Sequence, residues 1–324
     1  MREKEIRQTY RFLGHKQCTE LRIINPFRFG DVQSIFVYNE DDFVSICKKF
    51  NGVGNVYVGI NERTNGGTKS EDIVCLNAVV FDIDPVRPRG LASNEEEQKA
   101  AYEVAKNLIK YLTDSGKEPA LAMSGNGYQV WIKMYVRIDG TYKGRQLELV
   151  LKDMQRFTAE KFSTKKVKID NIGDLARVIK VIGTKSIKVA TTEERPNRNS
   201  KWLIYPPVPR PHVDWGNKLL QIASTRDPAP TMGRFVYGER ILNKNIIRVI
   251  SRLDGKAKRL FHGDYSDYPS RSEAEFGFLH MLKGMGLNDK ESYSVMEYSG
   301  LTKWKTATDR YREHTIGKVF ETTR

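Results

Sequence analysis

The chain has 324 residues, enough for one large domain or two smaller ones that each bury a hydrophobic core. It carries 54 Lys and Arg against 40 Asp and Glu, and the formal net charge of +14 predicts a polyanionic partner such as nucleic acid. Three cysteines without metal-binding spacing argue against a disulfide framework or a zinc site and fit a reducing cytoplasm. No apolar run is long enough to cross a bilayer, so we expect no membrane association.

The first 210 residues alternate strand-like and helix-like segments. Helical spacing of apolar residues predicts helices over 39–50, 93–113 and 141–162, with Asn39 and Ser93 as caps of the first two. Apolar and β-branched runs predict strands at 20–24, 34–38, 55–60, 79–84, 120–123, 128–134, 167–170, 178–182 and 202–205. The expected fold of residues 1–210 is therefore an α/β domain with a mixed sheet.

The pattern changes after residue 210. Six prolines between residues 206 and 230 favour an irregular connection, which we assign to residues 211–238. Beyond it, apolar residues recur at helical intervals over 241–253, 272–285, 289–299 and 307–320. Residues 239–324 are thus expected to form a small all-helical domain.

The most informative motif is a pair of acids at the end of the apolar run 79–85. Side chains alternate across a strand, so Asp82 and Asp84 project from one face while Phe81 and Ile83 project from the other. Two carboxylates held so close repel each other unless a cation lies between them. Such hard oxygen ligands suit Mg²⁺ or Mn²⁺, which complete their shells with water and phosphate. The motif indicates a metal site for phosphoryl chemistry.

A second motif, S-G-x-G, occupies residues 124–127. Its glycines permit a tight turn whose backbone N–H groups can approach an anion. In the strand that follows, Gln129 and Lys133 share a face. The segment could cradle a triphosphate, and an ordinary hairpin turn is the alternative interpretation.

The third motif lies within residues 167–186. Asp170 ends a predicted strand and is the candidate third carboxylate, whereas Asp174 precedes a short turn that it could cap. Arg177 and Lys180 could neutralise phosphate charge or simply be solvated at the surface.

The order of these segments resembles the archaeo-eukaryotic primase–polymerase superfamily: D-x-D on a strand, S-G-x-G before another strand, then an acid followed by A-R-V-I-K-x-x-G-T. More narrowly, it resembles the primase–polymerase domains of archaeal plasmid and phage replication proteins. Residues 20–24 and 54–63 match the opening of that narrower group, and residues 270–276 and 299–304 match its helical C-terminal module.

The resemblance implies a catalytic core like an RNA-recognition motif, in which Asp82, Asp84 and Asp170 hold two divalent ions. These ions would activate the attacking hydroxyl and stabilise the leaving pyrophosphate. The residues assigned to nucleotide binding are Ser124, Gly125, Gln129, Lys133, Arg177 and Lys180, and those assigned to nucleotide or template contact are Arg22, Asn61 and Arg63.

Two positions depart from the family pattern. Gln129 stands where the family usually has a histidine that binds the triphosphate, and a neutral amide cannot replace the positive charge. Lys133, on the same face, could compensate. Lys180 replaces the usual arginine and remains a phosphate binder, as a point charge instead of a fork.

We therefore expect a template-dependent nucleotidyltransferase, a DNA primase, a DNA polymerase or both, in plasmid or phage replication. Its expected partners are single-stranded DNA, ribo- or deoxynucleoside triphosphates and a helicase region or protein. Two alternatives stay open: a non-catalytic replication-initiator module that binds DNA by charge, which Gln129 favours, and a metal-dependent nuclease, which paired aspartates also serve.

Overall fold

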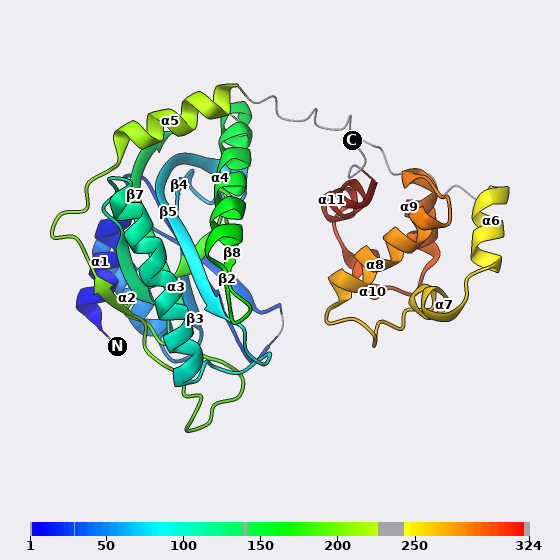
Figure 1. Ribbon diagram of the computed structural model, residues 1–324, viewed down its shortest axis with the longest axis horizontal. Helices are drawn as coiled ribbons and strands as arrows, with labels where there is room; N and C mark the ends of the chain where they lie inside the picture. The colour runs from blue at the N-terminus through cyan, green and yellow to red at the C-terminus, as the bar shows by residue number, and fades with distance from the viewer. Residues whose placement is uncertain (1, 29, 139–140, 226–242, 321–324) are drawn as a thin grey trace. The chain divides into compact units, whose positions relative to one another are not determined.

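The computed structural model describes residues 2–28, 30–138, 141–225 and 243–320 (Figure 1). The chain divides into two compact units, Met1–Ala229 and Pro230–Arg324, which are described separately. No helix in the described ranges is both long and apolar enough to span a membrane.

The first unit is built around a large sheet. Its strand order is β10-β6-β7-β5-β4. Strands β4 and β8 pair with the same edge of β5, β4 near its beginning at residues 73–75 and β8 near its end at residues 82–85. The strands are β4 (Glu62–Arg63), β5 (Ile73–Pro85), β6 (Ala120–Met123), β7 (Tyr128–Arg137), β8 (Val167–Asp170) and β10 (Lys201–Ile204). The short 3₁₀ helix η1 (Ser70–Asp72) leads into β5.

The core of this sheet has a β-α-β-β-α-β arrangement. Helix α3 (Glu95–Asp114) connects β5 to β6, and α4 (Thr141–Phe162) connects β7 to β8. The spatial order β8-β5-β7-β6 is that of a ferredoxin-like split βαβ fold, which the RNA-recognition motif shares. The predicted α/β catalytic-domain fold with this core is confirmed.

The sheet was expected to be mixed, and this part of the prediction is wrong. Every ladder between named strands is antiparallel. The reason is that each helical crossover passes over one strand. Strands β5 and β6 run in the same direction, but β7 lies between them and runs the opposite way; β5 in turn separates β7 from β8.

A second, four-stranded sheet has the order β2-β1-β3-β9. It consists of β1 (Thr19–Ile24), β2 (Val32–Val37), β3 (Asn55–Gly59) and β9 (Val178–Lys180), with helices α1 (Glu3–Leu13) and α2 (Glu40–Phe50) packed on it. Asn39 caps α2 as predicted, because its side chain accepts a hydrogen bond from the Asp42 N–H. The cap of α3 is Asn94 instead of Ser93.

Two apolar cores lie on opposite faces of the large sheet. On one face, Phe81 and Ile83 of β5 pack under α3, α4 and α5 (Val213–Ser224), which cover the sheet in Figure 1. On the other face, Ala78 and Val80 of β5 and Trp131 of β7 share a core with α1, α2 and the small sheet. The side chains of β5 therefore alternate between the two cores, as the sequence predicted.

Helix α5 corrects the expected domain boundary. It lies inside the segment 211–238, which we expected to be irregular, and it packs on α4 and β7 as part of the first unit. The prolines stand on either side of the helix, and residues 226–242 of the predicted connection lie outside the described residues. Helix α1 was also not predicted.

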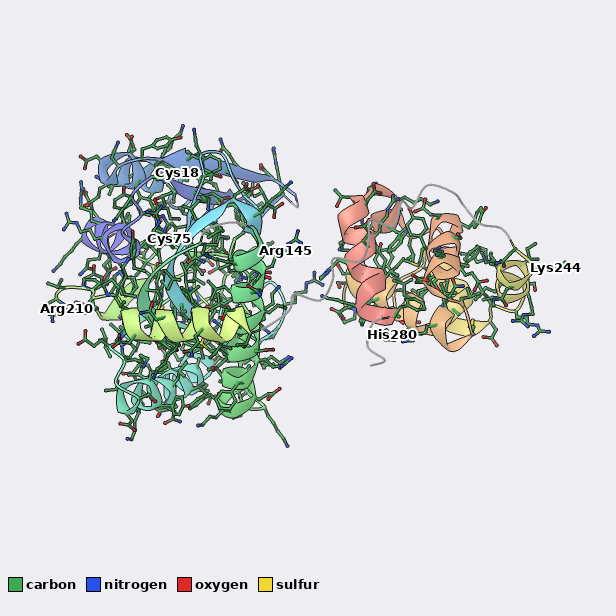
Figure 2. All side chains as sticks on the ribbon, turned by 90° about the horizontal axis from the view of Figure 1, so that it is seen from above. Cys18, Cys75, Arg145, Arg210, Lys244 and His280 are labelled. Atoms are coloured by element: carbon green, nitrogen blue, oxygen red, sulfur yellow. The ribbon has the colours of Figure 1, made fainter. Side chains whose placement is uncertain are left out.

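The second unit is helical, as expected. It contains α6 (Lys244–Ser251), α7 (Gly255–Phe261), α8 (Arg271–Gly284), α9 (Asp289–Tyr298), α10 (Thr302–Thr306) and α11 (Asp309–Phe320) around a core of its own. In the first unit, Cys18, Cys47 and Cys75 are free and buried; Figure 2 labels Cys18 and Cys75.

Candidate active site

The predicted acids form a row across three strands of the large sheet. In register, Asp82 of β5 is directly opposite Asp170 of β8 on one side and Gln129 of β7 on the other. Residues directly opposite each other in an antiparallel pair project from the same face. Asp84 lies two residues further along β5 on that face. On the same face, β5 carries Ala78 and Val80 in the core, so it becomes acidic only where the core ends.

A second row of polar side chains crosses the small sheet. Ser34 of β2, Arg22 of β1, Tyr57 of β3 and Lys180 of β9 are aligned in register. They lie on the face opposite the apolar residues Leu21 and Val58 of the same strands. This row contributes the cationic groups Arg22 and Lys180 to the same cavity as the acids.

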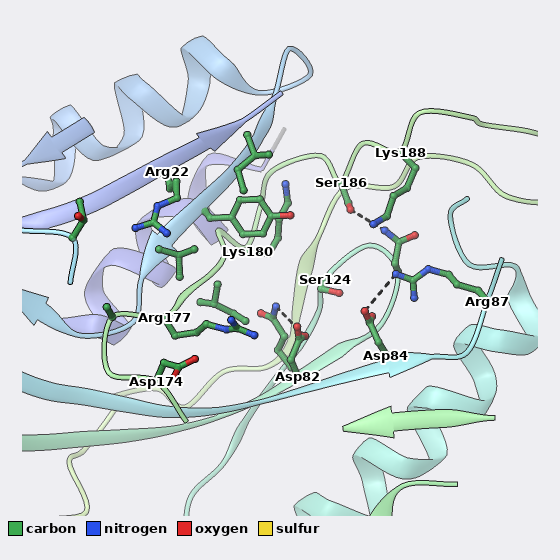
Figure 3. Close-up of a pocket in the computed structure, with 18 residues that line it drawn as sticks. Arg22, Asp82, Asp84, Arg87, Ser124, Asp174, Arg177, Lys180, Ser186 and Lys188 are labelled. Atoms are coloured by element: carbon green, nitrogen blue, oxygen red, sulfur yellow. Dashed lines mark hydrogen bonds and ion pairs between the residues drawn. The ribbon is translucent and has the colours of Figure 1, made fainter. Parts of the chain in front are cut away.

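A cavity of about 510 Å³ is lined by both rows (Figure 3). Its volume is in the range of small-molecule binding sites. Seven residues that the sequence assigned to the site line it: Arg22, Asp82, Asp84, Ser124, Gln129, Arg177 and Lys180. Asp170 does not line the cavity; it is exposed on β8 directly beside Asp82.

The acids repel one another strongly. Burial, and then the charges of Asp84 and Asp170, raise the pKa of Asp82 to about 8. Asp170 is accessible to solvent at its side chain but partly desolvated by its neighbours, and this desolvation and then Asp84 raise its pKa, while Arg177 acts in the opposite direction on both acids. Such crowding of carboxylates is what a bound cation would relieve.

The donor set fits a hard divalent cation in its chemistry. Besides the carboxylates, Gln129 Oε1 is buried and has no hydrogen-bond partner among the described residues, and its Nε2 lies 3.4 Å from Asp82 Oδ1. No three carboxylate, histidine or cysteine side chains in the described ranges are arranged as a metal-binding group. Asp84 is instead paired with Arg87, whose Nη2 lies 3.4 Å from Asp84 Oδ2.

The S-G-x-G segment is a hairpin turn between β6 and β7 that also lines the cavity. Gly125 has a φ of +105°, which favours glycine. The Gly127 N–H donates to Ser124 Oγ at 3.1 Å, and this fixes the hydroxyl at the cavity wall. A Cβ atom at Gly127 would lie 2.5 Å from Asp84 Oδ1 and would collide with the Ile83 carbonyl. The missing side chain therefore lets the turn pack directly against the acidic end of β5.

Three cations lie near one another along the cavity. Lys180 Nζ donates to the Lys185 carbonyl at 2.7 Å, and burial, together with the smaller effect of the Lys188 charge, lowers its pKa to about 7. Burial and then Arg87 lower the pKa of Lys188, whose ammonium group has no hydrogen-bond or ion-pair partner among the residues described. Lys188 is repelled by Arg87 and itself repels Lys180, while the charges of Asp84 and Asp82 attract it. An anion bound among the three cations would be stabilised by them.

Four residues assigned to ligand contact do not line the cavity: Gly125, Lys133, Asn61 and Arg63. Gly125 shapes the turn between the lining residues Ser124 and Asn126. Lys133 is buried and donates to the Leu13 carbonyl, so it cannot replace the missing histidine charge. Asn61 is buried, donates to the Leu175 carbonyl at 2.9 Å and accepts from the Asn77 N–H at 3.0 Å. Arg63 is fully buried in an ion pair with Glu20. Strand alternation gave the correct face for Lys133, but that face is covered by α1 at this depth.

Several cavity residues were missed by the sequence analysis. Asp174, expected to cap a turn, lines the cavity and pairs with Lys152 at 2.9 Å. Arg87 follows the D-x-D motif by three residues, and Lys188 follows the G-T-K-S segment by two; both lie in loops without periodicity, where spacing gives no signal. The other missed polar lining residues are Tyr57, Thr68, Asn126 and Ser186.

No protein-family model and no curated protein sequence matches this chain. Solved structures do match. The crystal structure of primase RepB' is 14% identical, with a TM-score of 0.42, covering 98% of this chain and 93% of that one. The primase–polymerase (AEP) domain of cyanophage S-2L is 14% identical, with a TM-score of 0.40 over 68% of this chain and 97% of that one.

The polymerase domain of Mycobacterium tuberculosis ligase D, solved in complex with DNA, is 13% identical. Its TM-score is 0.37, and the match covers 70% of this chain and 88% of that one. At such identities and scores the likeness concerns the fold alone, and function has to be argued from the site.

Replacing Gly127 by alanine tests the contact between the turn and the acids. We expect Gly127→Ala to displace Asp84 or the turn and to reduce the activity of the site about 100-fold, as a shift of about 1 Å in a reacting group can do. The measurement is nucleotide incorporation, described below. Gly144→Ala is the matched control, because a Cβ there would meet Ile138 Cγ2 at an ordinary 3.4 Å. Equal activities of the two variants would contradict the proposed contact.

Proposed function

We propose that this protein is a template-dependent nucleotidyltransferase, a DNA primase or DNA polymerase that acts in plasmid or phage DNA replication. One observation carries the proposal: the acids Asp82 and Asp84 of one sheet and the cations Arg22 and Lys180 of the other line one cavity of nucleotide size. Nucleotidyl transfer needs both charges close together, because metal ions and phosphates meet at the reacting phosphorus.

The acids would hold the metal ions. Asp82, Asp84 and Asp170 offer hard oxygen atoms to Mg²⁺ or Mn²⁺, and the raised pKa values of Asp82 and Asp170 indicate that a cation is favoured there. When bound, a pair of such ions activates the attacking hydroxyl and stabilises charge on the leaving pyrophosphate. A metal ion bound through both oxygens of Asp84 would compete with the contact of Oδ2 to Arg87.

The cations would bind the triphosphate. Lys180, Lys188 and Arg87 line the cavity from three different segments, and the Ser124 and Ser186 hydroxyl groups stand among them (Figure 3). A triphosphate placed there would neutralise the mutual repulsion of the cations, and an Arg87 released from Asp84 would gain a phosphate partner. Arg177 lies on the opposite side of Asp82 from Arg87 and would neutralise charge at the reacting end.

The substrates in this proposal are single-stranded DNA and ribo- or deoxynucleoside triphosphates. The net charge of +14 supports binding of the template phosphates, with an affinity that falls as salt rises. A helicase region or protein as a partner remains a prediction from the family resemblance.

The catalytic proposal is tested by incubating the protein with single-stranded DNA, labelled nucleotides and Mg²⁺ or Mn²⁺, with and without a primer. We expect products that disappear in Asp82→Asn and Asp84→Asn. Both variants should fold about as stably as the wild type, because Asn keeps the shape of Asp. Asp82, with a pKa of about 8, is already largely protonated at neutral pH, and Asp84→Asn removes a charge that repels Asp82. Asp114→Asn, at an exposed position on α3, is the control that keeps full activity.

Each other outcome of this assay has a meaning. Unchanged incorporation in both acid variants would overturn the proposal. Salt-sensitive DNA binding without any incorporation would favour the non-catalytic initiator module. Degradation of single-stranded DNA without nucleotides would favour the nuclease.

The triphosphate assignment has its own test. We expect Lys188→Met to raise the KM for nucleotide about 10- to 100-fold, because a charge-assisted contact contributes roughly 1.5–3 kcal/mol. Template affinity should change much less. Lys110→Met, which removes an exposed ammonium on α3, controls for the loss of net charge. The assignment is wrong if the two methionine variants have the same KM.

A further inference from the structure

The first unit contains a buried ion pair between a strand of the large sheet and a strand of the small sheet. The side chains of Arg63, on β4, and Glu20, on β1, are both completely shielded from solvent and contact each other directly. Arg63 Nε and Nη2 are buried without a hydrogen-bond partner in the part of the chain described. Gly59 makes room for this guanidinium, since a Cβ there would lie 2.9 Å from Arg63 Cζ. Buried charges of this kind are costly and do not by themselves stabilise a fold.

The second carboxylate oxygen of Glu20 connects the pair to the cavity. Glu20 Oε1 accepts hydrogen bonds from Arg22 Nε at 2.8 Å and from Ser34 Oγ at 2.8 Å, and Arg22 Nη2 lies 2.6 Å from the same oxygen. Glu20 and Arg22 are two residues apart on β1, so they share a face. Only Arg22 reaches the cavity: its side chain is 25% exposed and lines the wall.

Glu20 is shared by two arginines, Arg22 and Arg63, so the three charges do not cancel. Two arginines and one carboxylate leave a net charge of +1, and Arg63 neutralises Glu20 from the buried side. Arg22 is therefore oriented by Glu20 while the group of three keeps a net positive charge. Within the described part of the chain, the contacts of Arg22 with Glu20 use Nε and Nη2, which leaves Nη1 for a ligand. Without Arg63, the buried carboxylate would have Arg22 as its single counterion and would hold it back from the cavity.

We propose that Glu20 and Arg63 are positioning residues that present the Arg22 guanidinium to a phosphate group in the cavity, either of the nucleotide or of the template strand. This inference rests on the proposed function and deepens it. Arg22 is aligned with Lys180 across β3, so a chain of phosphates lying along the cationic row would reach both.

The experiment is a double-mutant cycle read as binding, so it does not depend on turnover. The variants are Arg22→Met, Glu20→Gln, Arg63→Met and the two doubles that combine Arg22→Met with each of the others. Dissociation constants are measured by titration for two probes, Mg²⁺–dATP and a single-stranded oligothymidylate. The probe that Arg22→Met weakens identifies the source of the phosphate.

We expect Arg22→Met to weaken binding of one probe about 10- to 100-fold, the loss typical of a charge-assisted contact. Arg63→Met and Glu20→Gln should weaken the same probe at least threefold, and neither should weaken it further once Arg22 is absent. Arg63→Lys, which restores the buried charge, should recover most of the binding. Effects of Arg63 or Glu20 that multiply with that of Arg22, or binding unchanged in all three single variants, would overturn the inference.

Stability is measured in parallel by thermal unfolding. Val58→Ala, on the opposite, apolar face of β3, destabilises the same sheet without touching the triad and should leave both dissociation constants unchanged. If Arg63→Met does not fold, the Glu20→Gln arm decides. A wild-type protein that binds both probes but incorporates no nucleotide would disprove the proposed function and leave this inference to be judged by the cycle.

Discussion

The site depends on one constraint, the register of the antiparallel strands β8, β5 and β7. That register places Asp82 directly between Asp170 and Gln129, where burial and then the charges of Asp84 and Asp170 raise the pKa of Asp82 to about 8. A one-residue slip of β5 would turn Asp82 and Asp84 into the apolar core on the opposite face. The register is held by Phe81 and Ile83, whose burial under the helices fixes which face carries the acids. The chemistry of the cavity is therefore a consequence of core packing on the far side of the same strand.

Much of the scaffold could be predicted from sequence because its signals are local. The acids at 82 and 84 follow an apolar strand, and capping residues mark α2 and α3 to within a residue. Strand direction was not predictable in this way. Both helical crossovers skip a strand, and that depends on which strands pair across long distances. Helix α5 was missed because the prolines on either side of it dominate the local composition.

The candidate site was predicted only where the motif residues themselves form it. Asp82, Ser124 and Lys180 line the cavity. Lys133 and Arg63 are also polar residues that the sequence analysis assigned to the site, but they are buried elsewhere. Alternation gives the face of a strand but not what covers that face, and both of these residues lie under other elements. Conversely, Arg87 and Lys188 line the cavity but were not predicted, because they lie in loops whose positions depend on the tertiary fold.

These two errors together explain how a neutral Gln129 fits the site. If a histidine charge were simply missing, the triphosphate side would be weakened, and Lys133 cannot make up the difference because it donates to the Leu13 carbonyl. Two loop cations, Lys188 and Arg87, line the cavity with Lys180, and in the proposed function they would provide the charge instead. Gln129 is then free of a phosphate-binding role. Its amide lies against Asp82, and its unpartnered oxygen belongs with the acids. Under the proposed function, Gln129 therefore belongs to the acidic side of the site, and the loop cations would provide the positive charge that the family's histidine usually carries.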